Sequence, residues 1–574
     1  MSDCDASPRK SRNAARSASG WRRVPAVVGA ILSALAVVGT TAVPAFAHDT
    51  SPPASPTSGI TLDPGLGPLH HPVSTRNTLA QAYFDQGLKL VFAFNHEAAI
   101  RSFQRAFDLD PKLAMAQWGI ALALGPNINK PMGPPAHKAA YAALQKAIAL
   151  EQYASPADRD YIDALAKRYS ADPDADLGPL QLAYARAMKE VVRRHPRDDD
   201  AAVLYAESLM DLNPWKFWSP DGKPADGTQE IVAVLERVLK RNPDHIGANH
   251  YYIHALEASP HPELALPSAH RLAVLAPSAG HLVHMPAHVY IRTGNYLKAA
   301  AANVAAVEAD ERRAATGEAS FYLVAYYGHN LHFLAIADAF AGRSAAAIAA
   351  ASKLYDVEAP RVKDVTEVDG AGFLMAKEMM QVQFERWDEI LALPEPAFEA
   401  PIAAAMWHFA RTLALAGTGH GVEAKAERAK FGQAASTLTK TMGYGNNDAA
   451  GLAAVAVPYL DGRLALMAGD AATAIAELRK AVAAEDALVY DEPPDWYLPS
   501  REPLGAALLR IREPSAAEQV FRDELARHRE SPRALYGLHA ALVAEGRAKE
   551  AAAVERRFRH AWRAADVRLD LATL

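Results

Sequence analysis

The sequence almost lacks cysteine: Cys4 is the single one in 574 residues. One thiol excludes a disulfide framework and any cysteine-ligated zinc or iron–sulfur site. A Gly-x-Ser-x-Gly elbow for a serine nucleophile is also missing, and no glycine-rich phosphate loop follows a strand. Basic residues are not in excess, because the net charge is −6, and this argues against nucleic acid as a partner. What is present is the composition of a folded protein, 50% hydrophobic and 22% charged.

The first 47 residues have the three parts of a secretory signal peptide. Six basic residues precede an apolar stretch from Val24 to about Val43, and Ala45-Phe46-Ala47 supplies a small-residue cleavage pattern. Cleavage there removes six basic and two acidic residues, so the net charge moves from −6 to −10, and it removes Cys4. We therefore expect an exported protein, periplasmic or secreted, with no stable membrane span after cleavage. The alternative is an uncleaved membrane anchor.

The rest of the chain reads as helices interrupted by loops. Residues 48–74, rich in Pro, Ser, Thr and Gly, predict a flexible leader. From Thr75 onward apolar residues recur every three or four positions, which predicts helices almost everywhere and strands nowhere. Three proline-rich segments, 127–135, 213–227 and 490–501, cannot continue a helix. Such loops are either lids over a groove or inserts that cover apolar surface, and both interpretations stay open.

Small and aromatic residues repeat at spacings that suit closely crossing helix pairs. The segments are Tyr83…Gly87-Leu88…Ala99…Phe103…Ala106…Pro111, then Gly505…Leu508…Ala517…Phe521 and Ala474…Leu478…Ala481. Here the sequence resembles the tetratricopeptide-repeat (TPR) superfamily, whose 34-residue helix–turn–helix units stack into a right-handed superhelix, although the tryptophan near the start of each unit is mostly missing. The resemblance extends from about Leu79 to Trp562. It implies an all-α, right-handed superhelical solenoid of TPR-like helix pairs with loop insertions.

We divide the predicted solenoid by its composition. Residues 75–240 hold TPR-like helices with insertions, 241–345 are histidine-rich TPR-like units, and 346–574 are C-terminal TPR-like helices with a cap. Ten of the 21 histidines lie between His245 and His332, where a uniform distribution would place about 3.5. The histidine-rich part is therefore the candidate functional region.

The histidines fall into three groups with helical spacing, so each group shares one face of its helix. The groups are His250, His254 and Glu257 at i, i+4 and i+7; His281, His284 and His288 at i, i+3 and i+7; and His329 and His332 at i, i+3. His250 and His284 are 34 residues apart, as are His254 and His288, so stacked units would bring them side by side. In the TPR superfamily the corresponding positions of the first helix line the concave groove, and Glu207 and Asp211 of an earlier unit would face it as well.

This pattern predicts a transition-metal site in the groove, with ligands His250, His254, His281, His284, His288, His329 and His332. Imidazole ligands without thiolate favour copper or zinc, and the carboxylates of Glu257 and Glu207 make iron or manganese possible. Either glutamate is a candidate catalytic base. The alternative is a polar groove whose histidines bond to neighbouring tyrosines and Asn330. Pro286 is expected to bend its helix and to shift His288 relative to His284.

Two functions remain open. The first is a metal-dependent enzyme, redox or hydrolytic, acting on a small molecule. The alternative is a non-catalytic TPR scaffold that binds a peptide or protein partner in the cell envelope.

Overall fold

The computed structural model divides the chain into two units, residues 1–48 and 49–574. The structure describes residues 60–315, 321–362, 372–396 and 400–574. The predicted signal peptide and the first part of the predicted leader lie outside these residues. The rest of the leader, from Ile60, packs on the helices: Leu66 is buried, and Nδ1 of His71 lies 2.8 Å from Oδ2 of Asp200.

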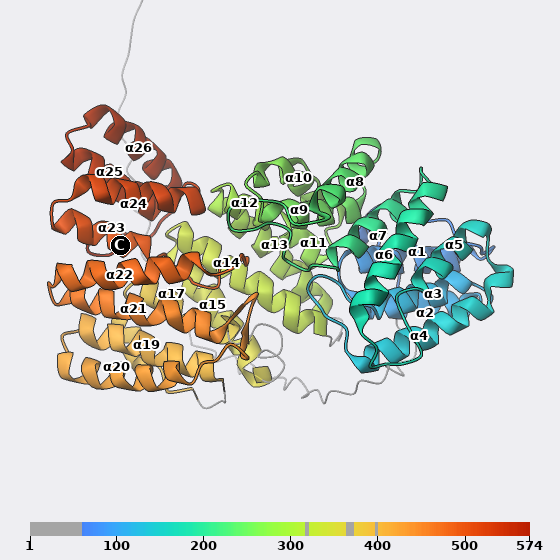
Figure 1. The fold of residues 1–574 in the computed structure, drawn as a ribbon, viewed down its shortest axis with the longest axis horizontal. Helices are drawn as coiled ribbons and strands as arrows, with labels where there is room; N and C mark the ends of the chain where they lie inside the picture. Colours follow the sequence, from blue (N-terminus) through green and yellow to red (C-terminus); the bar gives the residue numbers. More distant parts are fainter. Residues whose placement is uncertain (1–59, 316–320, 363–371, 397–399) are drawn as a thin grey trace, which may run out of the picture. The chain divides into compact units, whose positions relative to one another are not determined.

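The described chain is built almost entirely from helices (Figure 1). The first half contains α1 (Thr78–Phe92), α2 (His96–Leu109), α3 (Ala114–Ala123), α4 (Pro134–Ala149), α5 (Pro156–Leu165), α6 (Leu177–Arg194), α7 (Asp199–Met210), α8 (Thr228–Arg241), α9 (Ile246–Glu257), α10 (Leu266–Leu275), α11 (Gly280–His284), α12 (Pro286–Arg292) and α13 (Tyr296–Ala314). Side-chain caps start several of them: Asn77 accepts from the first turn of α1, and Ser155 forms a capping box with Asp158 on α5.

The second half continues in the same way. It contains α14 (Gly328–Phe340), α15 (Ser344–Glu358), α17 (Gly372–Gln383), α18 (Trp387–Ala392), α19 (Pro401–Gly417), α20 (Gly421–Ser436), α21 (Ala449–Met467), α22 (Ala471–Asp486), α23 (Arg501–Arg510), α24 (Pro514–Arg527), α25 (Pro532–Ala544) and α26 (Ala548–Ala561). In the described residues the strands are β1 (Gly443–Tyr444) and β2 (Asn447–Asp448), one antiparallel pair. A π-helical turn, Leu323–Tyr327, precedes α14.

Consecutive helices pack in pairs, as in α1 with α2, α14 with α15, α21 with α22 and α25 with α26. The predicted all-α solenoid of TPR-like helix pairs is confirmed. Its histidine-bearing helices, α9, α11 with α12, and α14, are the first helices of three successive pairs, and α10, α13 and α15 are their second helices.

Glycines set the closeness of the helix crossings that the sequence pattern indicated. A Cβ atom at Gly87 or Gly119 would lie 2.5 or 2.6 Å from the ring of Phe103. Phe521 has the same relation to Gly505 and Gly537, with distances of 2.3 and 2.2 Å. In both repeats a phenylalanine from a second helix is therefore clamped between two first helices, and glycine is the residue that leaves room for its ring.

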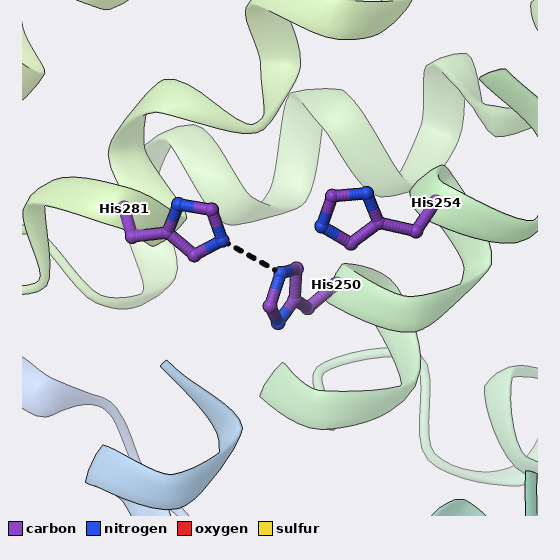
Figure 2. A group of neighbouring side chains, drawn as sticks. All are labelled: His250, His254 and His281. Carbon is purple, nitrogen blue, oxygen red and sulfur yellow. Dashed lines mark hydrogen bonds between the residues drawn. The ribbon is translucent and has the colours of Figure 1, made fainter. Parts of the chain in front are cut away.

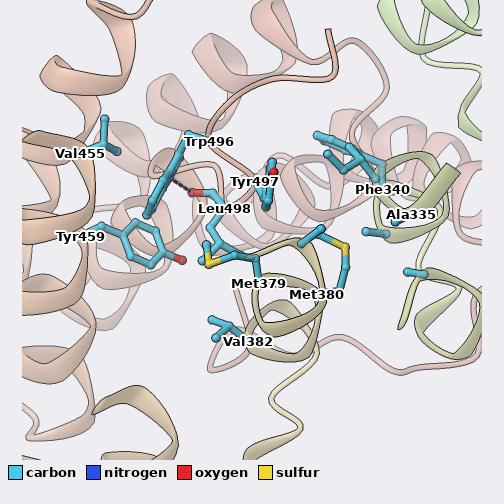
Figure 3. Packing of buried hydrophobic residues seen from close by; sticks show 14 of the residues in the cluster. Ala335, Phe340, Met379, Met380, Val382, Val455, Tyr459, Trp496, Tyr497 and Leu498 are labelled. Carbon is cyan, nitrogen blue, oxygen red and sulfur yellow. Dashed lines mark hydrogen bonds between the residues drawn. The ribbon is translucent and has the colours of Figure 1, made fainter. Parts of the chain in front are cut away.

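The buried apolar side chains form two clusters, one mostly from residues 66–289 and one mostly from residues 287–574. The third predicted loop contributes to the second cluster, because Trp496, Tyr497 and Leu498 are buried against α17 and α21 (Figure 3). The indole of Trp496 lies 5.2 Å from the ring of Tyr459 and donates to the carbonyl of Leu498. This loop is thus anchored as a packing insert.

One described helix, α21, is long and apolar enough to cross a membrane, with a mean hydropathy of 1.3. More than half of it is buried inside the protein, and it packs on α22 and α19. These contacts are those of a core helix.

Candidate metal centre

Six of the seven predicted ligands converge, and they form two groups of three. His250 and His254 come from α9, His281 and His284 from α11, His288 from α12 and His329 from α14. Pro286 divides the expected single helix into α11 and α12, as its missing N–H requires. The first group, trio 1, consists of His250, His254 and His281, and the second, trio 2, of His284, His288 and His329. Within each trio, one ring nitrogen per residue lies within 4.8 Å of the others.

In trio 1 two imidazoles face each other across adjacent units. Nε2 of His250 lies 3.1 Å from Nε2 of His281, and His254 points toward the same space (Figure 2). Nε2 of His254 is buried and has no hydrogen-bond partner among the described residues. Two nitrogens bound to one tetrahedral ion at 2.0–2.1 Å would be about 3.3 Å apart, so this spacing suits a shared cation.

Trio 2 is tighter. Nε2 of His284 lies 2.7 Å from Nε2 of His288 and 3.1 Å from Nε2 of His329. All three nitrogens that meet here are Nε2 atoms, and they come from three helices. The two trios are adjacent, because the rings of His254 and His288 are 5.6 Å apart.

The Nδ1 atoms on the far side of these rings determine the tautomers. Nδ1 of His250 donates to the carbonyl of Phe92 at 2.7 Å, since a carbonyl can only accept. Nδ1 of His284 lies 2.7 Å from Oδ1 of Asn303, whose amide nitrogen donates to Ala299, so His284 is again the donor. In their neutral forms both rings therefore carry an Nε2 lone pair that faces inward.

Glu257 links the two trios from behind. Its Oε1 lies 2.6 Å from Nδ1 of His254, and its Oε2 lies 2.6 Å from Nδ1 of His288. Burial would raise the pKa of Glu257, but His288 and His254 hold it below its usual value, so the carboxylate is ionised. The predicted base is thus a carboxylate that orients one imidazole of each trio, and Tyr490 also donates to it.

Burial keeps most of these imidazoles neutral. It lowers the pKa of His250, His281, His284 and His329 well below the usual value, and neighbouring histidines lower it further. His288 differs: burial opposes its charge, yet the Glu257 carboxylate raises its pKa. Neutral imidazole is the form that binds transition metals.

A phenylalanine underlies each trio, which the sequence pattern did not indicate. The ring of Phe94 lies 4.6, 6.1 and 5.3 Å from those of His250, His254 and His281. Phe333 lies 5.0, 5.1 and 5.9 Å from His284, His288 and His329. Phe333 follows one residue after the predicted His332, whereas Phe94 lies far from the histidines in sequence. These rings exclude water from one side of each group.

A cavity of about 670 Å³ opens onto both trios. His254, His281, His288 and His329 line it, together with residues 126–132, Pro214–Trp215 and Asp491–Glu492. These three segments belong to the three predicted proline-rich loops. The loops therefore border the space beside the histidines, and the third loop is both a cavity wall and a packing insert.

Two predicted site residues lie apart from the trios. Nε2 of His332 bonds to the hydroxyl of Tyr497 at 2.7 Å, so His332 joins neither group. Glu207 lies beside Asp211, 3.9 Å from the guanidinium of Arg168, which also bonds to Asp211. Burial raises the pKa of both carboxyls. Of these three residues, Glu207, Asp211 and Arg168, Asp211 lines the cavity beside the trios.

No family model and no curated protein matches the chain. Solved structures that resemble it include the human IFIT1 dimer with m7Gppp-AAAA (14% identity, 85% of this chain and 91% of that one, TM-score 0.29), yeast Tom70 (12%, 83% and 90%, TM-score 0.26) and the P58(IPK) TPR domain (11%, 82% and 99%, TM-score 0.20).

Proposed function

We propose that this helical-repeat protein binds two transition-metal ions, one in each trio. The observation that carries the proposal is the convergence of three ring nitrogens in each trio, where Nδ1 of His250 and Nδ1 of His284 donate outward and leave their Nε2 lone pairs facing inward. The Nε2 atoms of His284 and His288 are 2.7 Å apart, closer than the about 3.3 Å between two ligands of one ion, so the two rings would separate slightly when a cation binds between them. A proton on His288 would also satisfy the contact, so a proton competes with the metal ion.

The donor set is six imidazoles without thiolate, which favours copper or zinc, with iron as a further possibility. Open access from the cavity supports a reaction on a small molecule, in which the metal would serve as a redox centre or a Lewis acid. The basic, apolar and small residues of the first 47 positions support export to the periplasm or the medium.

Elemental analysis tests the metal proposal directly. Protein purified after growth with copper, zinc and iron should contain about two ions per chain. The double variant His250→Ala/His284→Ala, which removes one ligand from each trio, should contain none. His329→Ala should lose one ion, while His332→Ala, one helical turn away on α14, should keep both. Absence of metal in the parent protein, or equal loss in His332→Ala and His329→Ala, would refute the proposal.

A second candidate function is a scaffold that holds a peptide or protein partner. A cleft of about 1010 Å³, lined by Trp215, Trp218, Tyr490 and Arg292 among others, favours it. Aromatic rings and an arginine are the side chains that contribute most at protein interfaces. This function would survive the double histidine variant, so the elemental analysis and a partner-binding assay separate the two.

A further inference from the structure

A second cavity, of about 520 Å³, lies where the described part of the leader meets the solenoid. It is lined by residues 68–72 of the leader and by residues at or just before the beginnings of α5, α7 and α9. None of its lining residues also lines the cavity beside the trios. The two cavities are therefore separate sites with separate side chains.

The side chains around this second cavity carry an excess of negative charge. Three of its five aspartates have partners that account for them. Asp158 caps α5, Asp199 contacts Arg241, and Nε of Arg271 lies 3.4 Å from Oδ1 of Asp244. The other two carboxylates remain to be explained. The five lining aspartates, against one lining arginine, are Asp158, Asp198, Asp199, Asp200 and Asp244.

The two remaining carboxylates, Asp198 and Asp200, converge with an imidazole of the leader. One oxygen of each and one ring nitrogen of His71 lie within 4.8 Å of one another. Nδ1 of His71 is 2.8 Å from Oδ2 of Asp200, and the two side chains are only 8% and 11% exposed. One imidazole with two carboxylates is a donor set that suits zinc or manganese.

Neutral donors hold both carboxylates in place. Nδ1 of His245 accepts from the amide of Ala248 at 3.2 Å, so its Nε2 carries the ring proton and donates to Oδ1 of Asp200 at 3.1 Å. The hydroxyl of Tyr161 donates to Oδ2 of Asp198 at 2.8 Å. Neither carboxylate pairs with a lysine or arginine of the described chain. These contacts orient the carboxylates as the outer partners of metal ligands do, and they leave the negative charge uncompensated.

His71 has one ring nitrogen to spare. Its Nδ1 faces Asp200, whereas no residue that the structure describes forms a hydrogen bond with its Nε2. A neutral imidazole carries its proton on either nitrogen. With the proton on Nε2, Nδ1 offers a lone pair to a cation that lies beside both carboxylates.

We propose that His71, Asp198 and Asp200 bind one divalent metal ion, which fastens the leader to the beginning of α7. The ion takes the place of the proton between Nδ1 of His71 and Oδ2 of Asp200. These atoms separate slightly when it binds, because two ligands of one ion are about 3.3 Å apart. The cavity leaves room for water molecules to complete the coordination. The site shares no residue with the trios, so the proposal stands or falls independently of the proposed function.

The probe is Mn²⁺, which carboxylate ligands suit better than the all-imidazole trios do. The full chain, dialysed against a chelator, is titrated with Mn²⁺, and the electron paramagnetic resonance signal of the free ion gives the amount bound. The parent should bind one ion per chain. The double variant His250→Ala/His284→Ala should bind it equally well, which separates this site from the trios.

Asp198→Asn tests the ligand set and preserves the local fold, because asparagine caps a helix as well as aspartate does. Its affinity for Mn²⁺ should fall by at least about tenfold. Asp244→Asn is the matched control: it removes a charge from the same cavity wall, where Asp244 is exposed, and should bind like the parent. Circular dichroism confirms that each variant is folded.

Thermal unfolding supplies a second measurement. Mn²⁺ should raise the unfolding temperature of the parent and of Asp244→Asn, since an ion that binds the folded state stabilises it. It should not do so in His71→Gln, whose amide still donates to Asp200. A folded parent that binds no Mn²⁺ would overturn the proposal. Equal weakening in Asp198→Asn and Asp244→Asn would overturn it too, because the ion would then be held by the general negative charge of the cavity.

Discussion

The carboxylate of Glu257 lies 2.6 Å from Nδ1 of His288, and its other oxygen is equally close to Nδ1 of His254. One buried anion is therefore shared between an imidazole of each trio. This arrangement makes both Nε2 atoms better donors toward a cation and fixes the planes of both rings. The Glu257 carboxylate also supplies negative charge beside the proposed ligands, most of which are neutral imidazoles.

Replacing Glu257 should weaken both metal sites together. In Glu257→Gln the amide oxygen still accepts from one imidazole, but its NH₂ group faces the other Nδ1, and the negative charge is gone. We expect the affinity for metal to fall by about 10–100-fold at both sites, with two ions still bound at saturation. Competition with a chelator of known affinity measures this.

Tyr490→Phe is the matched control, since it removes only the hydroxyl that donates to Glu257. Its affinity should fall much less than that of Glu257→Gln, because one hydrogen bond to the carboxylate is lost while the negative charge and both imidazole contacts remain. Unchanged affinity in Glu257→Gln would show that the carboxylate does not support the metal.

Glu207 lies in a buried network with Asp211 and Arg168, and we predict that this network contributes to stability. Arg168 is 1% exposed and is the cation that faces both Glu207 and Asp211. Arg168→Met should lower the free energy of unfolding by about 3–5 kcal/mol, because it leaves the two buried carboxyls without their cation. Denaturant titration measures the change.

Two comparisons complete that prediction. Arg193→Met, in an exposed pair with Glu190 on α6, should leave the denaturation midpoint unchanged. The folded Arg168→Met protein should keep its metal, and loss of metal at full stability would instead place this network at the metal site.

The helix periodicity and the 34-residue register predicted seven gathered histidines, and six of them lie in the two trios, whereas His332 does not. They placed His250 beside the His281–His288 group because neighbouring units of a solenoid repeat the same geometry. The sequence also predicts a bend at Pro286, since proline lacks the donor that a continuous helix needs. Local spacing carries this information, and the structure confirms the helix pairs that it implied.

The partition of the histidines could not be predicted, because it depends on contacts between distant residues. His332 forms a hydrogen bond with the hydroxyl of Tyr497, which lies 165 positions further along the chain. The hydrogen-bond partner of His250 is also distant in sequence, because the carbonyl of Phe92, which accepts from it, lies 158 residues earlier. A helical face specifies which residues share a direction, whereas the partner that each atom finds depends on how the whole chain packs.

A buried carboxyl on α17 that belongs to neither trio makes stability depend on pH. Burial raises the pKa of Glu378, on α17, to about 7, and its Oε2 has no hydrogen-bond partner among the described residues. The folded state therefore binds this proton more tightly than the unfolded state, whose glutamate pKa is about 4.3. The free energy of unfolding should fall as the pH rises from about 4.3 to 7, by up to about 3 kcal/mol from this group alone.

Glu378→Gln should remove that slope and be more stable than the parent at pH 8, whereas Glu423→Gln, exposed on α20, should follow the parent curve. Denaturant titrations between pH 5 and pH 8 measure both variants, and parallel curves for Glu378→Gln and the parent would contradict the assignment.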